Sequence, residues 1–271
     1  MEKVKVKIEV ELEIKNGKVV LPTGTTQLMK FNNASRYCKN LTSIEIPDSV
    51  TKIGKEAFAD CGSLTSVKIP SSIKEIGSYS FSVCVSLSSI EIPNSVIKIG
   101  EGAFSVCTGL TSIVIPDSVK KIEAFTFCRC SRLTNIQIPS SVTKIGNFSF
   151  VQCNSLKSID IPNSVTEIGE SAFSHCSSLT SIKIPDSVKK IGRSAFEGCS
   201  GLMSVEFSNS LIELGDYVFS WITGQCALQQ IIVPTGTTGE FKKLLPKTLH
   251  HLIVEKYEKN RKFAASFSSP V

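Results

Sequence analysis

Apolar residues return at fixed positions along this chain with a period of 23 residues. We number the positions of each copy from its leading Leu and call the copies coils 1 to 8. Coils of equal length begin at Leu41, Leu64, Leu87, Leu110, Leu133, Leu156 and Leu179, and a longer coil 8 begins at Leu202. Such a period is typical of a solenoid, in which stacked copies bury apolar surface that one copy cannot bury alone.

The copies begin with a Leu-x-x-Ile-x-Ile-Pro pattern, in which Val67 and Val205 replace the first Ile and Phe207-Ser208 replace Ile-Pro in coil 8. This alternation predicts a short strand with positions 4 and 6 facing the core. Pro at position 7 ends the strand because it cannot donate a backbone hydrogen bond. Gly at position 14 marks a turn, and Glu123 replaces it once, so we expect this turn to tolerate another residue. Segments such as residues 55–60 predict one helical turn that directs position 18 inward and positions 16 and 20 outward.

Two invariant positions predict columns that run through the stack. Position 18 is Phe in all eight coils, so we expect a column of stacked rings to carry the core. Position 9 is Ser in all eight coils, which favours a column of hydroxyls bonded to buried turn backbone over a generic exposed turn residue. The Phe column comprises Phe58, Phe81, Phe104, Phe127, Phe150, Phe173, Phe196 and Phe219.

The chain has ten cysteines, and those at position 21 recur every 23 residues from Cys38 to Cys199. One coil rise falls within the Cα separation that a disulfide allows, so distance alone leaves a disulfide framework open. Side chains of one column point the same way rather than at each other, so we expect reduced thiols buried in the core. Cys128 and Cys226 lie off the column, and we expect them to be more accessible.

The Leu-x-x-Ile-x-Ile-Pro run, the Ser, the Ile-Gly pair and the Ala-Phe-x-x-Cys run resemble the 23-residue class of BspA-type leucine-rich repeats, from Leu41 to about Ala227. The resemblance implies an α/β solenoid, a right-handed leucine-rich-repeat superhelix with one short parallel strand per 23-residue coil, capped at both ends. It also implies a surface or interaction protein rather than an enzyme.

The chain divides into four expected segments. They are an N-terminal β-hairpin and capping coil (residues 1–40), eight leucine-rich repeats (41–227), a C-terminal capping repeat (228–257) and a mobile tail (258–271). The hairpin turns at Asn16-Gly17. Within the C-terminal cap we expect a strand over 228–234, a short helix over 240–245 and a closing strand or helix over 248–256.

Charge and hydropathy restrict the classes of function. The net charge of +6 is spread evenly, without the basic block typical of nucleic-acid binding. No run of about 18 apolar residues predicts a membrane span. The start at Met1 lacks the apolar core of a signal peptide, so we expect a cytoplasmic protein if Met1 is the native start. We expect a cell-surface or secreted protein if a signal peptide was removed.

Few residues of the sequence are candidates for catalysis or for binding a metal ion or cofactor. The three histidines, His175, His250 and His251, form no nucleophile–base arrangement with other residues at a recognisable spacing. The cysteine spacing fits no zinc pattern, and phosphate-binding glycine loops and calcium loops are absent from the sequence. We therefore predict no catalytic residue, no metal ligand and no cofactor.

Two surfaces remain as candidates for binding. Positions 3 and 5 form a small, polar strand face of mixed charge, either a binding face or a solvated sheet. On the turn side, coils 2 to 5 carry apolar residues at positions 16, 19 and 20, where other coils carry Lys, Glu, Arg or Ser. Exposed apolar patches mark contact surfaces, and the alternative is packing between neighbouring coils. The predicted partner-binding residues are Tyr79, Val83, Val106, Phe125, Phe148 and Val151.

These observations predict a non-enzymatic scaffold for protein interaction or adhesion, which presents a rigid repeat surface to a protein or glycan. A preorganised surface lowers the ordering cost of binding. We expect a monomer or weak self-association. The alternative is a structural spacer or a self-assembling unit.

Overall fold

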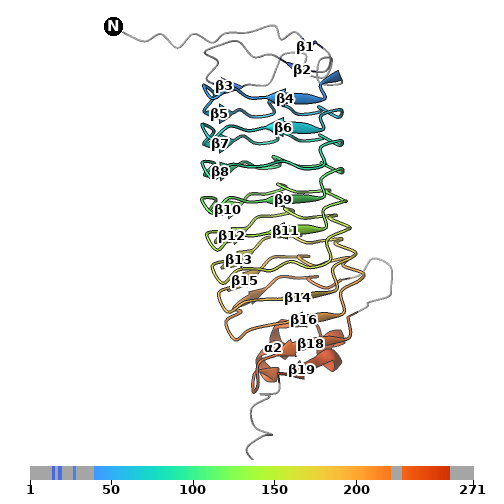
Figure 1. Ribbon diagram of the computed structural model, residues 1–271. Helices are drawn as coiled ribbons and strands as arrows, with labels where there is room; N and C mark the ends of the chain where they lie inside the picture. The colour runs from blue at the N-terminus through green and yellow to red at the C-terminus, as the bar shows by residue number, and fades with distance from the viewer. Residues whose placement is uncertain (1–13, 16–17, 20–26, 29–39, 221–227, 257–271) are drawn as a thin grey trace, which may run out of the picture.

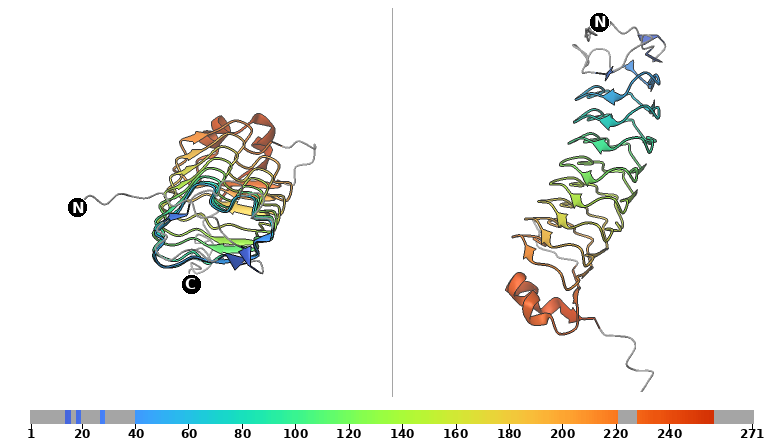
Figure 2. Two further views of the ribbon diagram at one scale, coloured as in Figure 1. Left: turned by 90° about the horizontal axis from the view of Figure 1, so that it is seen from above. Right: turned by 90° about the vertical axis from the view of Figure 1, so that its left-hand side faces the viewer.

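The computed structural model describes residues 14–15, 18–19, 27–28, 40–220 and 228–256, which form a single stack of coils (Figure 1). Equivalent residues of neighbouring coils pair in parallel, for example Ile44 with Val67 and Ile145 with Ile168. Seen along the stack, successive coils overlay one another with a gradual shift (Figure 2). The predicted parallel solenoid of 23-residue coils is confirmed.

In coils 1, 2, 4, 5, 7 and 8 the predicted strand at positions 3 to 5 forms one face of the stack, which we call the first strand row. The prediction of this strand is wrong in coils 3 and 6, where residues 89–91 and 158–160 form no strand. Where the strand forms, its central residue is buried and the neighbours of that residue face outward, as in Ser66–Lys68. This alternation follows from the Leu-x-x-Ile-x-Ile pattern. The row consists of β4 (Ser43–Glu45), β6 (Ser66–Lys68), β9 (Ser112–Val114), β11 (Asn135–Gln137), β14 (Ser181–Lys183), β16 (Ser204–Glu206), β18 (Gln230–Val233) and β19 (Ile253–Glu255).

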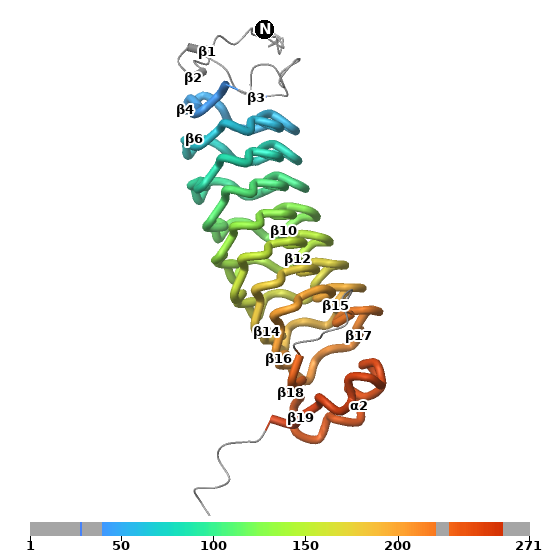
Figure 3. Tube along the Cα trace, turned by 90° about the vertical axis from the view of Figure 1, so that its right-hand side faces the viewer, coloured from blue at the N-terminus to red at the C-terminus, as the bar shows by residue number. Residues whose placement is uncertain are grey.

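A second strand in most coils, at positions 12 and 13, forms what we call the second strand row on another face of the stack (Figure 3). The sequence pattern predicted only one strand per coil. A two-residue strand offers one charged outward residue and one buried Ile, which is too short an alternation to be recognised. The row consists of β3 (Gln27–Leu28), β5 (Lys52–Ile53), β7 (Glu75–Ile76), β8 (Lys98–Ile99), β10 (Lys121–Ile122), β12 (Lys144–Ile145), β13 (Glu167–Ile168), β15 (Lys190–Ile191) and β17 (Glu213–Leu214).

The Ser column at position 9 joins consecutive coils as predicted. Each bonded hydroxyl donates to the carbonyl of position 10 in the preceding coil, at 2.6 Å for Ser72 to Val50 and 2.8 Å for Ser95 to Ile73. Ser118, Ser141 and Ser164 make the same contact. The hydroxyl of Ser187 is buried without a hydrogen-bond partner.

The predicted Phe column is confirmed. Neighbouring rings from Phe58 to Phe219 are stacked, with centroids 5.2 to 5.9 Å apart. All eight rings are buried. One repeat alone would leave its Phe ring largely exposed, whereas the stacked rings of all the coils form a continuous core.

The Cys column lies beside the Phe column, and most of its thiols are free. Each thiol from Cys84 to Cys199 donates to the Phe carbonyl of the preceding coil, with Sγ–O distances of 3.1 to 3.2 Å. Burial raises the pKa of Cys107 and of Cys199 to about 12. The prediction of a wholly reduced column is wrong at Cys61, which is disulfide-bonded. Half-buried Cys128 is free, and Cys226 lies outside the described residues.

Both ends of the stack are covered. β1 (Ile14–Lys15) pairs antiparallel with β2 (Lys18–Val19), and β2 pairs in parallel with β4. The predicted turn at Asn16-Gly17 lies outside the described residues. At the other end, α2 (Thr238–Leu244) and the 3₁₀ helix η2 (Lys247–Leu252) lead into β19, which pairs with β18. Phe241 of α2 packs on Phe207, with ring centroids 5.2 Å apart. The expected mobile tail over 258–271 lies outside the described residues.

Candidate partner-binding surface

The turn segment of each coil, positions 15 to 21, is not the predicted helical turn. The N–H groups of positions 16, 18 and 20 donate to the following coil, as Phe58 does to the Ser80 carbonyl at 2.7 Å. The intervening N–H groups donate three residues back, as Ala59 does to Glu56. The segment is a series of tight turns that also forms a ladder between coils, so positions 16 and 20 are not helical neighbours.

This backbone places positions 16 and 20 in the left-handed region, with φ between 49° and 69°. Glycine adopts that region freely, and Gly102 and Gly198 occupy two of these positions. β-Branched residues rarely adopt it, yet Val83 and Val106 do so with φ of 62° and 59°. Residues held in such conformations store conformational strain that the surrounding structure must offset.

Position 16 carries an aromatic ring in coils 2, 4 and 5 and Gly102 in coil 3. The Tyr79 ring lies over Gly102, where a Cβ atom would come within 2.3 Å of it. The Tyr79 hydroxyl donates to the Glu101 carboxylate at 2.6 Å, and this bond, with partial burial, raises the pKa of Tyr79 to about 12. The rings of Phe125 and Phe148 are stacked, with centroids 4.9 Å apart and planes 6° apart.

We call the six predicted residues Tyr79, Val83, Val106, Phe125, Phe148 and Val151 the turn-side patch. All six are half-buried. The fold brings Phe125 and Phe148 into contact and places Val83 and Val106 at the same position of adjacent coils. Beyond Val106, position 20 becomes polar, and Arg129 donates to the Gln152 side chain at 2.9 Å. Position 20 therefore contributes apolar residues to the patch only in coils 2 and 3.

Aromatic residues of the last coil are separate from the patch. Tyr217 also occupies position 16 but is 58% exposed, and the Arg193 guanidinium lies 5.2 Å from its ring centroid. Trp221 lies outside the described residues. Tyr217 therefore occupies the same position six coils after Tyr79 and lies outside the turn-side patch.

The outward side of the first strand row is a polar face. Lys68 and Glu45 form an ion pair at 2.6 Å, as do Lys256 and Glu206. Val114 is 67% exposed, and its neighbours along the face are polar or charged. Exposed ion pairs add little stability, so this face has the character of a solvated sheet.

The second strand row is interrupted at one place, which the sequence interpretation missed. Strands β8 and β10 do not pair, although neighbouring strands pair on either side of them. At the flanking steps, Gly100 donates to Ile76 O at 2.8 Å and Gly146 donates to Ile122 O at 2.8 Å. Within residues 40–220, no such bond joins position 14 of coil 4 to coil 3. We call this opening the seam; Figure 1 shows the wider step between β8 and β10.

The replacement of Gly by Glu123 explains the seam. At position 14 of six other coils, a Cβ atom would come within 2.4 to 2.7 Å of the preceding coil. Such a contact is closer than van der Waals packing allows, so only Gly permits the normal approach of two coils. Glu123 has a Cβ atom and holds coil 4 away from coil 3. The turn tolerates Glu123, as expected, but the ladder between the coils opens.

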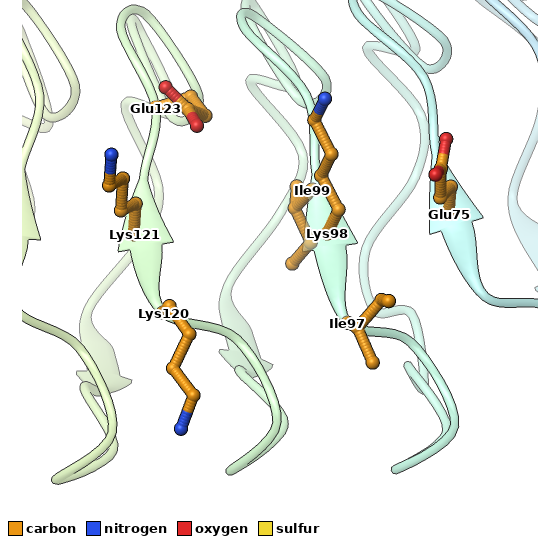
Figure 4. Close-up of a pocket in the computed structure, with 7 residues that line it drawn as sticks. All are labelled: Glu75, Ile97, Lys98, Ile99, Lys120, Lys121 and Glu123. Carbon is orange, nitrogen blue, oxygen red and sulfur yellow. The ribbon is translucent and has the colours of Figure 1, made fainter.

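A pocket of about 250 Å³ occupies the seam (Figure 4). In the close-up, Lys98 and Lys121 point to the same side, whereas Lys120 points to the opposite side. The Gly-to-Glu exchange at position 14 was the one sequence signal that could have located it. The pocket is lined by Glu75, Ile97, Lys98, Ile99, Lys120, Lys121 and Glu123.

Candidate chemistry remains sparse in the described part of the chain. No group of three or more His, Cys, Asp or Glu among these residues could hold a metal ion. The His250 ring instead lies 3.0 Å from the Leu245 carbonyl within the C-terminal cap. A search of the described residues for a helix long and apolar enough to cross a membrane finds none.

Comparisons with known proteins agree with the repeat pattern. The family model of the BspA type leucine rich repeat region matches residues 31–132 and 120–241, in six copies. No curated protein matches the chain.

Two solved structures resemble the chain over most of its length. The leucine-rich repeat protein of T. pallidum is 25% identical, covering 90% of this chain and 97% of that one, with a TM-score of 0.50. A leucine rich cell surface protein of Faecalibacterium prausnitzii is 26% identical, covering 91% of this chain and 87% of that one, with a TM-score of 0.47. On the extent of the family match and the coil geometry, the chain belongs to the BspA-type leucine-rich repeat family.

Proposed function

We propose that this repeat scaffold binds a protein or glycan partner through the turn-side patch, without catalysing a reaction. The observation that carries the proposal is a set of half-buried apolar side chains in coils 2 to 5, two of them valines in left-handed backbone. Other coils place Asp60, Gln152 or His175 at position 20, so the turn itself does not require Val.

Folding alone gives no reason for valine at these positions. A β-branched residue in the left-handed region is strained, and strain of this kind concentrates at functional sites. Half-exposed apolar side chains gain stability when a partner covers them. Strain together with exposure supports a contact surface more strongly than additional packing between coils.

The scaffold suits this role because its surface is rigid before binding. Phe125 and Phe148 are fixed by ring stacking at 4.9 Å, and Tyr79 is fixed by its bond to Glu101. Fixed aromatic side chains lose little conformational entropy on association, and aromatic residues are enriched among those that dominate binding energy. We therefore expect these three rings to contribute most to binding.

The double substitution Phe125→Ser with Phe148→Ser tests the proposal. If the patch is a binding surface, proteins and glycans retained by the wild-type chain from an extract of the native organism should be lost. The melting temperature should change little. Tyr217→Ser is the matched control, because it removes an aromatic residue from the same coil position outside the patch.

Two outcomes would contradict the proposal. Much earlier melting of the double variant would mean that the two rings mainly pack between coils. Equal retention of partners by the double variant and Tyr217→Ser would move the binding surface elsewhere. Sedimentation velocity separates the alternative class, since a self-assembling unit changes its mass with concentration and a spacer binds nothing.

A further inference from the structure

Position 12 of the second strand row carries an in-register column of charges. Opposite charges on neighbouring coils pair within it, with Nζ–O distances of 2.6 Å for Lys52–Glu75, 2.9 Å for Lys144–Glu167 and 2.8 Å for Lys190–Glu213. Lys98 and Lys121 are the two members left over. Within the described residues neither forms an ion pair, and their side chains point to the same side of the two coils that border the seam (Figure 4).

We propose that the seam binds an anionic group of an acidic polysaccharide, a carboxylate or a sulfate, between Lys98 and Lys121. Like charges opposite each other on neighbouring strands are destabilising, and a bound anion would relieve that repulsion. The anion would take the place that a glutamate takes at the other steps of the column. This site lies on the second strand row, so it is separate from the turn-side patch and goes beyond the function proposed for that patch.

The nearby carboxylates do not already serve as this anion. The Glu75 carboxylate bonds to Lys52 on its other side, and this bond holds the pKa of Glu75 below its usual value, with a smaller contribution from Lys98. Glu123 lies at the edge of the pocket, and in the described residues no lysine is within ion-pair distance of it. The seam therefore keeps an excess of positive charge.

The pocket suits a sugar unit in size and in chemistry. Its volume of about 250 Å³ is below the range for drug-sized ligands, so it accommodates one small ring or one charged group. The open ladder leaves the N–H of Glu123 and the carbonyl of Ile99 without the bonds that other coils make, and sugar hydroxyls both donate and accept. Ile97 is 57% exposed at the rim and offers an apolar contact.

A linear polyanion fits better than a compact acidic protein. Lysines at position 12 continue from Lys98 to Lys121 and Lys144, one per coil along the stack. A flexible charged chain can follow this line while one of its units enters the seam. The pocket admits a single residue-sized group, whereas specific protein interfaces bury far larger areas.

Binding of the full chain to dextran sulfate and to polygalacturonate, measured by titration calorimetry at low salt, tests the proposal. Neutral dextran and polyglutamate serve as comparison probes. Lys98→Gln with Lys121→Gln should weaken binding about fivefold, the effect of losing two ion pairs. Lys157→Gln with Lys189→Gln removes the same charge from other exposed positions and should leave binding within about twofold of wild type.

Two substitutions at position 123 separate geometry from charge. Glu123→Gly restores the residue of the other coils and should close the seam, so binding should fall although every lysine remains. Glu123→Gln removes the same negative charge but keeps the Cβ atom, so binding should be equal or stronger. If only the net charge of the site determined binding, both variants would bind the polyanion more tightly than wild type, because both lose one negative charge. Circular dichroism of each variant confirms that the chain is folded.

Several results would overturn the proposal. Equal weakening by the two double-lysine variants, or unchanged binding by Glu123→Gly, would mean diffuse attraction to a basic surface. Tight binding of neutral dextran would remove the role of charge. Binding of polyglutamate without either polysaccharide would identify an acidic protein segment as the ligand instead. None of these results depends on Phe125 or Phe148, so failure here leaves the turn-side patch unaffected.

Discussion

At the scale of single residues, a core side chain is held mainly by its copies in the adjacent coils. Phe127 is fully buried between Phe104 and Phe150, at centroid distances of 5.8 and 5.4 Å. A truncated ring leaves a cavity that rigid coils above and below cannot fill. The effect of a substitution therefore depends on its place in the column as well as on its own burial.

Phe127→Ala should lower the free energy of unfolding by about 3–5 kcal/mol, since both the transfer free energy of the ring and a cavity contribute. Denaturant titration measures the loss. Phe125→Ala, in the same coil but half-buried, is the control and should cost clearly less. A loss under about 1 kcal/mol for Phe127→Ala would be incompatible with its position in the stack.

Tyr79 gives a pH-dependent signal. Its bond to Glu101 favours the protonated phenol and raises its pKa to about 12 from an ordinary 10.0. The contribution of this bond to stability is present below pH 10 and is lost as pH rises through about 12. Absorbance titration of tyrosinate, wild type minus Tyr79→Phe, should show this late ionisation. Glu101→Gln should move it to lower pH, and an unchanged midpoint would contradict the assignment.

The residues of the core could be predicted from the sequence, and the backbone of the turn segment could not. Invariant Phe and Ser identified their columns because each must meet its own copy in the next coil. The pattern with position 18 inward and positions 16 and 20 outward fits a helical turn and a series of left-handed turns equally well. The strain at Val83 and Val106 therefore became visible only in three dimensions. The disulfide of Cys61 was likewise beyond an argument from side-chain direction.

At the scale of elements, two features of the fold, the second strand row and the seam, arise from contacts between coils and cannot be recognised in the sequence of one repeat. The second strand row escaped prediction because its strands have two residues each. The seam escaped because the effect of Glu123 falls on the preceding coil rather than on its own turn. Gly is required at position 14 because the backbone there lies very close to the preceding coil. A single substitution at this position therefore changes the spacing between two coils.

Hydrogen exchange tests the open ladder directly. The amide of Glu123 lacks the bond to coil 3 that Gly146 makes to coil 4, so it should exchange faster than the Gly146 amide. The Lys120 amide should likewise exchange faster than that of Thr143, which donates to Lys120 O at 2.9 Å. NMR-detected exchange measures all four amides. Equal protection at both steps would mean that the seam is closed in solution.

At the scale of the whole molecule, the chain is a one-dimensional array in which each coil touches only its neighbours. Its period and family could be predicted because they follow from the repeat itself. The expected segment boundaries at residues 40, 227 and 257 remain predictions. Stability in such an array is close to a sum of coil and interface contributions, so a weak step affects the two parts that it joins.

Thiol counting tests the redox state of the array. Ten cysteines with one disulfide, that of Cys61, leave eight free thiols after denaturation without reductant and ten after reduction. Few should react in the native state, because burial keeps the column thiols inaccessible and raises their pKa values. Half-buried Cys128 should react first among the described thiols. Ten thiols before reduction would contradict the disulfide.

The hydrogen bonds between coils run along the long axis of the molecule, and the two capping elements lie at opposite ends (Figure 1). A pulling force applied to the two ends would therefore act along these bonds, and the coils would separate one after another. Each released coil of 23 residues would lengthen the chain by about 75 Å. At a constant pulling speed the molecule would extend in equal steps at similar forces. A solenoid built this way would yield gradually under tension instead of losing its whole structure at once.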